Sequence, residues 1–426
     1  MRERSTFLLW RPISPEISPQ QSDRWVARPS PLRTRKVLIV AARPPSRALT
    51  SSLYLPHTFM ETPPTAPPPR PREVERRVIP VIGDSKVIVG RGLLETIPQE
   101  ITTLKSIKAS KFVIVSDANV WPLYGPTLVE AFEALGGYTV LGLGKEPSGD
   151  HVYDGKLLLC YQIPAGENSK SRDMKDAIED FMLLHRCNRD TCMVALGGGV
   201  VGDLVGFVAA TFMRGVPVVQ VPTSSTAMID SSVGGKTAIN VPAGKNLIGA
   251  FHQPTVVYAD MDCLATLERR ELAEGLAEAI KMGVIRLPSL FELLEANAEK
   301  VMSLDPELIE QVMYDSIRGK AEVVAEDERE AGVRSTLNWG HTIGHAIEAI
   351  KSPEMMHGEC VAAGCVAEAE LALRLALDSN QASGQLALPD ALRTASSSSD
   401  RPLMAEARRR PSAEPLNISY VSDHRM

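Results

Sequence analysis

The residue types best suited to chemistry gather late in the chain, where three of its eight histidines fall within 17 residues. The stretch NWGHTIGHAIE places His341 and His345 four residues apart, one turn along a helix face, and His357 follows them. Upstream, AEGLAEAIK places Glu274 and Glu278 one turn apart. Two histidines and a carboxylate with an open coordination position describe a catalytic zinc site. Because a single histidine is more often a capping or surface residue, that interpretation stays open beside the metal site.

A second stretch with chemical potential is a glycine turn that follows the apolar run MVAL. Gly197, Gly199 and Gly202 satisfy G-x-G-x-x-G and lead into an apolar, helix-like segment. A backbone without Cβ atoms at a helix N-terminus suits a pyrophosphate. The acid expected about 20 residues further on is missing, since that region reads VPTSSTA. The cofactor ribose is therefore held from elsewhere, or the turn connects a strand to a helix and binds nothing.

Polar residues on a small-residue background follow this turn. Asp230, Lys236, Asn240, Lys245 and Asn246 punctuate a run of Ser, Gly, Ala and Thr. Lysines and asparagines on a glycine-rich backbone suit a small ligand that carries phosphate or carboxylate. The alternative is a solvated loop; the apolar neighbours VGG and LIGAF favour a site.

Strand-like runs alternate with amphipathic segments through the middle of the chain, which predicts a parallel sheet covered by helices. We expect strands at 78–82, 86–89, 112–115, 138–143, 157–163, 193–196, 218–221 and 255–258, and helices at 128–135, 174–185 and 201–212. After residue 265 only helices are expected, at 268–284, 290–303, 306–323, 342–350 and 359–376. The predicted architecture is an α/β domain over 78–265 and an all-α metal and substrate domain over 266–377, with the nucleotide facing a cleft between them.

Composition excludes several classes of protein. The 426 residues are 44% hydrophobic and carry a formal charge of −6, which gives no reason to expect a nucleic-acid partner. No apolar run approaches the length of a membrane span. Six cysteines without a C-x-x-C pair indicate reduced thiols and a cytoplasmic location.

The two ends of the chain differ from its middle. Residues 1–77 hold 14 basic and 6 acidic residues and include the proline-rich run PPTAPPPRPR. Residues 1–72 are either an organelle-targeting segment or a disordered extension. Residues 378–426 are rich in Ser, Arg and Pro, and we expect a disordered low-complexity tail there.

Eight motifs in matching order carry a family resemblance: GGGVVGD, MRGVP, DSSVGGKTAIN, GKNLIGAF, AEAIK, DEREAGVR, LNWGHTIGHAIE and HGECVA. The region 78–376 resembles 3-dehydroquinate synthase, especially the first enzymatic unit of the fungal pentafunctional shikimate-pathway polypeptide. The resemblance implies a Rossmann-like α/β domain, a helical C-terminal domain, NAD, one Zn²⁺ or Co²⁺ ion, and a homodimer. It implies that DAHP, a keto acid phosphate, closes to 3-dehydroquinate with loss of phosphate, on the way to aromatic amino acids. NAD removes and returns the same hydride, so it is not consumed.

The resemblance also assigns roles to residues. It implies metal ligation by Glu278, His341 and His357. It implies cofactor contacts by Asp117, Asn119, Glu167, Lys170, Gly197, Gly198, Gly199, Gly202, Asp203, Thr223, Ser224 and Thr266. It implies substrate binding by Arg214, Asp230, Lys245 and Asn246, and catalytic contacts by Lys236, Lys281, Lys320, Glu330, Arg334, Asn338 and His345.

Two features depart from the family pattern. Residues 224–227 read SSTA where the family has two leucines, which we expect to pack beneath the cofactor. The tail offers no counterpart of a late lysine that reaches the substrate phosphate, and it would leave an apolar helix face uncovered. We therefore expect zinc and NAD binding to survive better than turnover. The alternatives are a related sugar phosphate cyclase, a metal-dependent polyol dehydrogenase and a non-catalytic remnant that binds NAD or metal.

Overall fold

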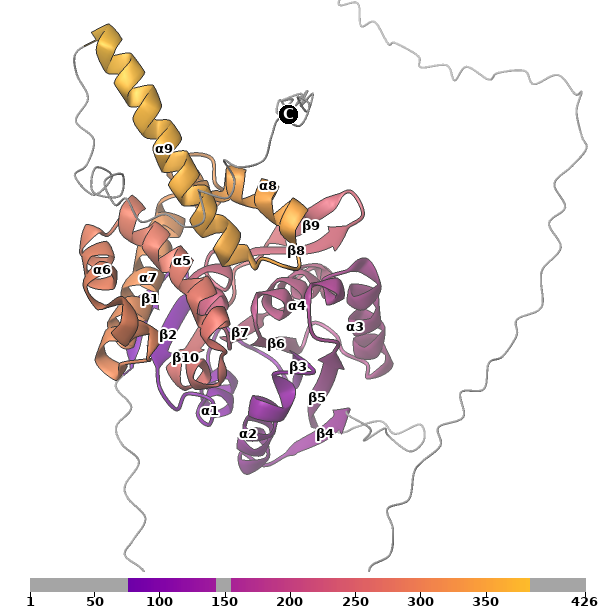
Figure 1. The fold of residues 1–426 in the computed structure, drawn as a ribbon. Coiled ribbons are helices and arrows are strands. Elements are labelled where there is room, and N and C mark those ends of the chain that lie inside the picture. The colour runs from indigo at the N-terminus through magenta and orange to yellow at the C-terminus, as the bar shows by residue number, and fades with distance from the viewer. Residues whose placement is uncertain (1–75, 143–154, 384–426) are drawn as a thin grey trace, which may run out of the picture. The chain divides into compact units, whose positions relative to one another are not determined.

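The computed structural model describes residues 76–142 and 155–383. Its main sheet has eight strands in the order β1-β2-β10-β7-β6-β3-β5-β4 (Figure 1). Every pairing in it is parallel except that of β1 with β2. The strands are β1 (Arg77–Pro80), β2 (Lys86–Gly90), β3 (Lys111–Asp117), β4 (Tyr138–Gly142), β5 (Lys156–Ile163), β6 (Thr191–Gly197), β7 (Val218–Pro222) and β10 (Val256–Asp260). All eight strands predicted from apolar runs are confirmed.

The sheet is buried on both faces, and this explains the continuous apolar runs. Along β3, Phe112 and Ile114 point into one hydrophobic cluster, while Val113 and Val115 point into a second one on the opposite face. Every residue of β6 is buried. Helices α1 (Ile97–Thr103), α2 (Trp121–Ala134), α3 (Arg172–Leu184) and α4 (Gly199–Thr211) connect the strands.

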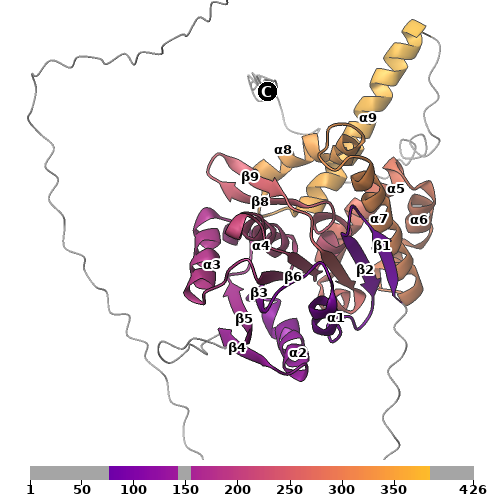
Figure 2. The same cartoon turned by 180° about the vertical axis from the view of Figure 1, so that it is seen from behind.

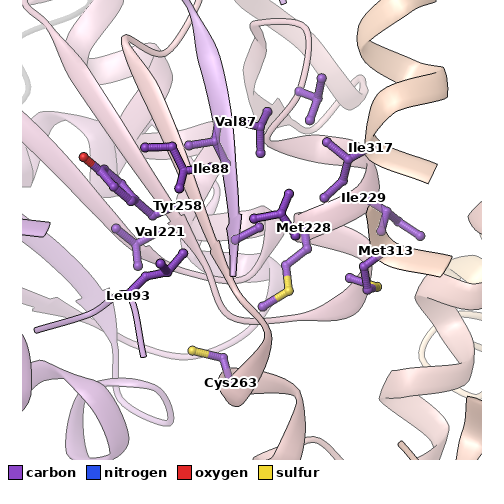
Figure 3. Close-up of a cluster of buried hydrophobic side chains, with 14 of the residues drawn as sticks. Val87, Ile88, Leu93, Val221, Met228, Ile229, Tyr258, Cys263, Met313 and Ile317 are labelled. Carbon is purple, nitrogen blue, oxygen red and sulfur yellow. The ribbon is translucent and has the colours of Figure 1, made fainter. Parts of the chain in front are cut away.

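The helical half follows β10 and the short helix η4 (Met261–Thr266). It consists of α5 (Arg269–Ile285), α6 (Pro288–Met302), α7 (Pro306–Glu326), η5 (Val333–Asn338), α8 (His341–Lys351) and α9 (His357–Ser383). All five predicted helices of this half are present. Figure 3 shows Met313 and Ile317 of α7 beside Ile229, in the same buried cluster as Val87 of β2. The helical half therefore shares its core with one face of the sheet.

Sequence patterns did not predict a two-stranded hairpin, β8 (Lys236–Val241) with β9 (Gly244–Phe251). Most residues of β9 are exposed or half-buried, so it lacks the apolar run that marks the buried strands. Of the polar stretch expected to bind an anionic ligand, Asp230 precedes the hairpin, whereas Lys236, Asn240, Lys245 and Asn246 lie on it. The hairpin lies beside α8 in both views (Figures 1 and 2).

The expected boundary between 377 and 378 lies inside α9, which continues to Ser383. The interpretations of residues 1–72 and of the tail from 384 concern segments outside the described residues. None of the helices that the structure describes has the length and hydrophobicity needed to cross a bilayer.

Candidate active site at the sheet edge and the helical half

The residues expected at the cofactor all lie at or after the carboxyl ends of neighbouring parallel strands. Asp117 ends β3 and Asn119 follows it; Glu167 and Lys170 follow β5; Gly197, Gly198, Gly199, Gly202 and Asp203 end β6 and begin α4; Thr223 and Ser224 follow β7; Thr266 follows β10. The strand order reverses between β3 and β6, since one connection leads towards β4 and the other towards β7. Ligands of open α/β sheets bind at such a switch point.

The glycine turn brings backbone close to its neighbours. A Cβ atom on Gly199 would lie 3.0 Å from the Ser231 hydroxyl oxygen, and one on Gly202 would lie 2.7 Å from Gln220 Oε1. Gln220 also donates a 3.1 Å hydrogen bond to the Gly202 carbonyl. Gly202 thus lets α4 pack on β7, while the first N–H groups of α4 have no partner within the helix and suit an anion.

The hairpin is tied to the turn that follows β5. Asn240 donates to Glu167 Oε1 at 2.7 Å, and Lys170 Nζ donates to Asp203 Oδ2 and Asn246 Oδ1, each at 2.5 Å. Lys170 is 5% exposed. Three residues expected at the cofactor and one expected at the substrate therefore meet in a single polar network.

The predicted metal ligands come together from three helices. Glu278 lies on α5, His341 begins α8 and His357 begins α9. Glu278 Oε1 lies 3.7 Å from His341 Nε2 and 3.8 Å from His357 Nε2. Both carboxylate oxygens of Glu278 are buried; Oε2 forms an ion pair with the Lys281 ammonium, and Oε1 has no hydrogen-bond partner. A buried carboxylate whose unpartnered oxygen faces two imidazoles fits a divalent cation.

Hydrogen bonds orient the two imidazoles. His341 Nδ1 lies 3.3 Å from the Trp339 carbonyl oxygen, and His357 Nδ1 lies 3.1 Å from Glu348 Oε2. When Nδ1 carries the proton, Nε2 is free to ligate a metal, which is the usual arrangement of metal-binding histidines.

His345 offers a second possible set of ligands. The donor atoms of His341, His345 and His357 all lie within 4.8 Å of one another. We favour Glu278 over His345 because its carboxylate supplies charge and its Oε1 atom has no hydrogen-bond partner, whereas His345 is exposed.

The His341 imidazole is neutral at physiological pH. Burial, aided by Lys281 and His357, lowers the pKa of His341 to about 4. Between pH 6.5 and about 4, His341 is therefore protonated in the unfolded chain but stays neutral in the folded protein. Because only the unfolded state gains this proton, the metal-free protein becomes less stable as the pH falls towards 4.

Replacing His341 by glutamine should remove this pH dependence. Relative to the variant, the metal-free parent should lose about 2 kcal/mol of unfolding free energy between about pH 7 and about pH 5. Urea unfolding at both pH values measures the difference. If the unfolding free energies of the parent and the variant differed by the same amount at both pH values, the prediction would be wrong.

The predicted anion-binding residues form three separate pairings. Lys320 Nζ lies 2.6 Å from Asp230 Oδ1 and 2.6 Å from the Asp230 carbonyl oxygen. Burial raises the pKa of Asp230, but Lys320 and Lys281 outweigh it and hold this pKa well below its usual range. The other two pairings are Lys236 with Glu330, which also accepts from Asn338 at 2.8 Å, and Lys245 with Glu348 at 2.8 Å.

Arg334 and Arg214 lie in different surroundings. Arg334 is 1% exposed, and its guanidinium donates to the carbonyl oxygens of Glu328 and Gly234. In this conformation it fastens the loop before η5 to the start of the hairpin. Arg214 is exposed in a left-handed conformation (φ 71°), and within the described residues no hydrogen bond or ion pair joins it to another predicted site residue.

The serine-rich segment after β7 packs against α5. Ser225 is fully buried, and its hydroxyl donates to the Glu271 carbonyl oxygen at 2.8 Å. A Cβ atom on Gly275 would lie 2.4 Å from that hydroxyl oxygen. The hydroxyl that replaces a family leucine here is therefore satisfied by a helix backbone.

One charged residue of this region was not predicted. Glu348 contacts both His357 and Lys245. The available signal was its position on α8, seven residues after His341 and so on the same helix face.

Fold and site define a class of protein in which a parallel α/β sheet with a glycine turn adjoins a helical half carrying potential metal ligands. The chain matches the family models of the 3-dehydroquinate synthase N-terminal domain over residues 160–274 and C-terminal domain over 275–404. The chain belongs to the 3-dehydroquinate synthase family.

Similar proteins include the pentafunctional AROM polypeptides of Schizosaccharomyces pombe, 44% identical over 323 residues, and Clavispora lusitaniae, 45% identical over 305 residues. The alignments cover 72% and 69% of this chain but 20% and 18% of those polypeptides, so the chain spans about a fifth of their length.

Two solved structures are also similar. One is 2-deoxy-scyllo-inosose synthase with carbaglucose-6-phosphate, NAD⁺ and Co²⁺, at 25% identity and a TM-score of 0.59, covering 71% of this chain and 77% of that one. The other is the 2-epi-5-epi-valiolone synthase ValA of Streptomyces hygroscopicus with NAD⁺ and Zn²⁺, at 27% identity and a TM-score of 0.56, covering 66% and 72%.

Proposed function

We propose that this chain is a 3-dehydroquinate synthase that converts DAHP into 3-dehydroquinate and phosphate with NAD and a divalent metal. One observation carries the proposal: the short helix η3 (Ala227–Ser231) joins the glycine turn to the helical half. Its Ser231 lies against Gly199, and its Asp230 binds Lys320 of α7. Helix α5, which carries Glu278, also packs against η3. The glycine turn, a predicted metal ligand and a buried cation therefore adjoin one short segment.

Glu278, His341 and His357 would hold the metal, Zn²⁺ or Co²⁺. When bound, the ion supplies Lewis-acid polarisation of hydroxyl and carbonyl oxygens. Lys281, 3% exposed beside Glu278, offers a cation at the same place. Burial lowers the pKa of Lys320 more than Asp230 raises it, which brings this ammonium closer to proton exchange.

Two lysines at the start and the tip of the hairpin are suited to the charged ends of the substrate. The side chains of Lys236 and Lys245 are each 48% exposed, so each ammonium can bind a phosphate or carboxylate beside Glu330 or Glu348. We assign Arg334 the task of holding the loop that carries Glu330, because both of its terminal Nη atoms bind carbonyl oxygens.

NAD, which supplies hydride transfer when bound, would lie over the glycine turn with Glu167 or Asp117 at a ribose. We expect NAD to bind at least tenfold more tightly than NADP, because either acid repels a 2′-phosphate. Calorimetric titration with both nucleotides measures this, and equal affinities would overturn the assignment. We also propose that the protein is cytoplasmic and forms a homodimer. Sedimentation of the purified protein measures its mass in solution and so tests for the dimer.

Phosphate release from DAHP, with the product identified by mass spectrometry, tests the proposed activity. The matched control is Glu278→Gln, which keeps the size of the side chain but removes the charge that holds the metal. The 44% identity to AROM polypeptides supports DAHP over the sugar phosphates of related cyclases. Turnover of a hexose or heptulose phosphate without turnover of DAHP would favour such a cyclase instead.

A further inference from the structure

Glu348 stands between a predicted metal ligand and the hairpin. Its Oε2 atom lies 3.1 Å from His357 Nδ1, and its Oε1 atom lies 2.8 Å from Lys245 Nζ. The Glu348 side chain is 13% exposed, whereas its contact with Lys245 lies at the surface. Each carboxylate oxygen thus has one partner, and the partners come from different parts of the fold.

We propose that Glu348 is a positioning residue that holds His357 for the metal and Lys245 for the substrate at the same time. This inference rests on the proposed function and extends it to a residue outside the predicted set. Glu348 pairs with Nδ1 of His357 and with Lys245, whereas Glu278 faces Nε2 on the other side of the His357 ring.

The role follows from the two nitrogens of His357. A carboxylate that accepts from Nδ1–H fixes the ring and leaves Nε2 as the donor to a metal, and it also makes the imidazole more basic. Nε2 of His357 is the atom that faces Glu278, at 3.8 Å from Oε1. Without Glu348 the ring could rotate or change tautomer, and the metal would lose a directed ligand.

The second contact extends the effect to the hairpin. Lys245 precedes Asn246, whose side chain accepts from Lys170 in the network around Glu167 and Asp203. Glu348 therefore anchors the hairpin from α8, and the Lys170 network anchors it from the sheet edge. Loss of Glu348 should weaken the metal site and also raise the substrate KM through Lys245.

Metal affinity of the purified protein, measured by competition with a chromophoric chelator for Zn²⁺, tests the first effect without any turnover. Glu348→Gln should weaken Zn²⁺ binding about 10–100-fold, the range for outer carboxylates at metal sites. The matched control is Glu354→Gln, an exposed glutamate three residues before His357 that pairs with Lys351 on the surface. The control should stay within twofold of the parent.

Two further variants separate positioning from a general loss of structure. Lys245→Met should leave Zn²⁺ affinity within about threefold of the parent while raising KM. In a His357→Ala background, Glu348→Gln should weaken the residual metal binding less than twofold, because its effect passes through His357. The absorption spectrum of the Co²⁺ protein should change in Glu348→Gln and not in Lys245→Met.

Less than fivefold weakening of Zn²⁺ binding in Glu348→Gln would overturn the inference. Equal weakening in Glu348→Gln and Glu354→Gln, or full additivity with His357→Ala, would overturn it too, because either would indicate a general structural effect. If the parent itself bound no metal, the proposed function would fail instead, so the two failures are distinguishable.

Discussion

Replacing His357 by alanine is expected to lower the metal affinity of the protein more than a hundredfold and to abolish phosphate release from DAHP. Structural zinc sites bind with an apparent free energy on the order of 10 kcal/mol, so one ligand of three is worth about 3 kcal/mol. Metal analysis after dialysis, together with chelator competition, measures the loss.

The variants Glu278→Gln and His345→Ala decide which residues complete the site. Glu278→Gln should lose metal as His357→Ala does, because it removes the only carboxylate within 4 Å of both His341 and His357 in the described residues. His345→Ala should keep its metal and lose turnover. Full occupancy in His357→Ala, or metal loss in His345→Ala with retention in Glu278→Gln, would rule out the ligand set.

The second large effect concerns the ion pair between Asp230 and Lys320. Asp230→Asn should reduce the free energy of unfolding by about 3 kcal/mol, because it leaves the buried Lys320 ammonium without its counter-charge. Lys320→Met should cost about 1 kcal/mol, since the Asp230 side chain is 31% exposed and keeps access to water. Urea unfolding of the metal-free proteins measures both changes.

A matched control for this pair lies on the surface. Arg269 and Glu299 form an ion pair with side chains 61% and 87% exposed, and Glu299→Gln should change stability by less than about 0.5 kcal/mol. An Asp230→Asn variant as stable as the Glu299→Gln control would show that Lys320 is not held as a buried cation. A larger cost for Lys320→Met than for Asp230→Asn would contradict the account as well.

The sheet was predictable because a parallel strand buried on both faces consists of apolar residues. β6 is the plainest case, since all of TCMVALG is buried. The hairpin β8–β9 was not predicted, because its exposed residues interrupt any apolar run and its lysines and asparagines are also typical of a ligand-binding loop. The strand pattern therefore identified the scaffold but not the element that presents Lys236 and Lys245.

The site was only partly predictable. His341 and His345 are linked by helical spacing, but Glu278 reaches them only through the packing of α5 against the later helices. That placement came from the family resemblance, since the residues alone left the ligand set open. For Arg334 the family resemblance implied a contact with substrate, whereas its hydrogen bond to the carbonyl oxygen of Gly234, far away in the sequence, has no local sequence pattern. Glu348 went unassigned because no helical spacing links it to His357 on the next helix, and Lys245 lies on a distant hairpin.

The most direct test of the central claim measures phosphate and NADH together while the purified protein turns over DAHP with a small, fixed amount of NAD. We expect many molecules of phosphate and of 3-dehydroquinate for each molecule of NAD, with no net rise in NADH absorbance. NADH accumulating in step with product would contradict it and indicate a dehydrogenase. Absence of phosphate release from a protein shown to hold both metal and NAD would contradict it equally.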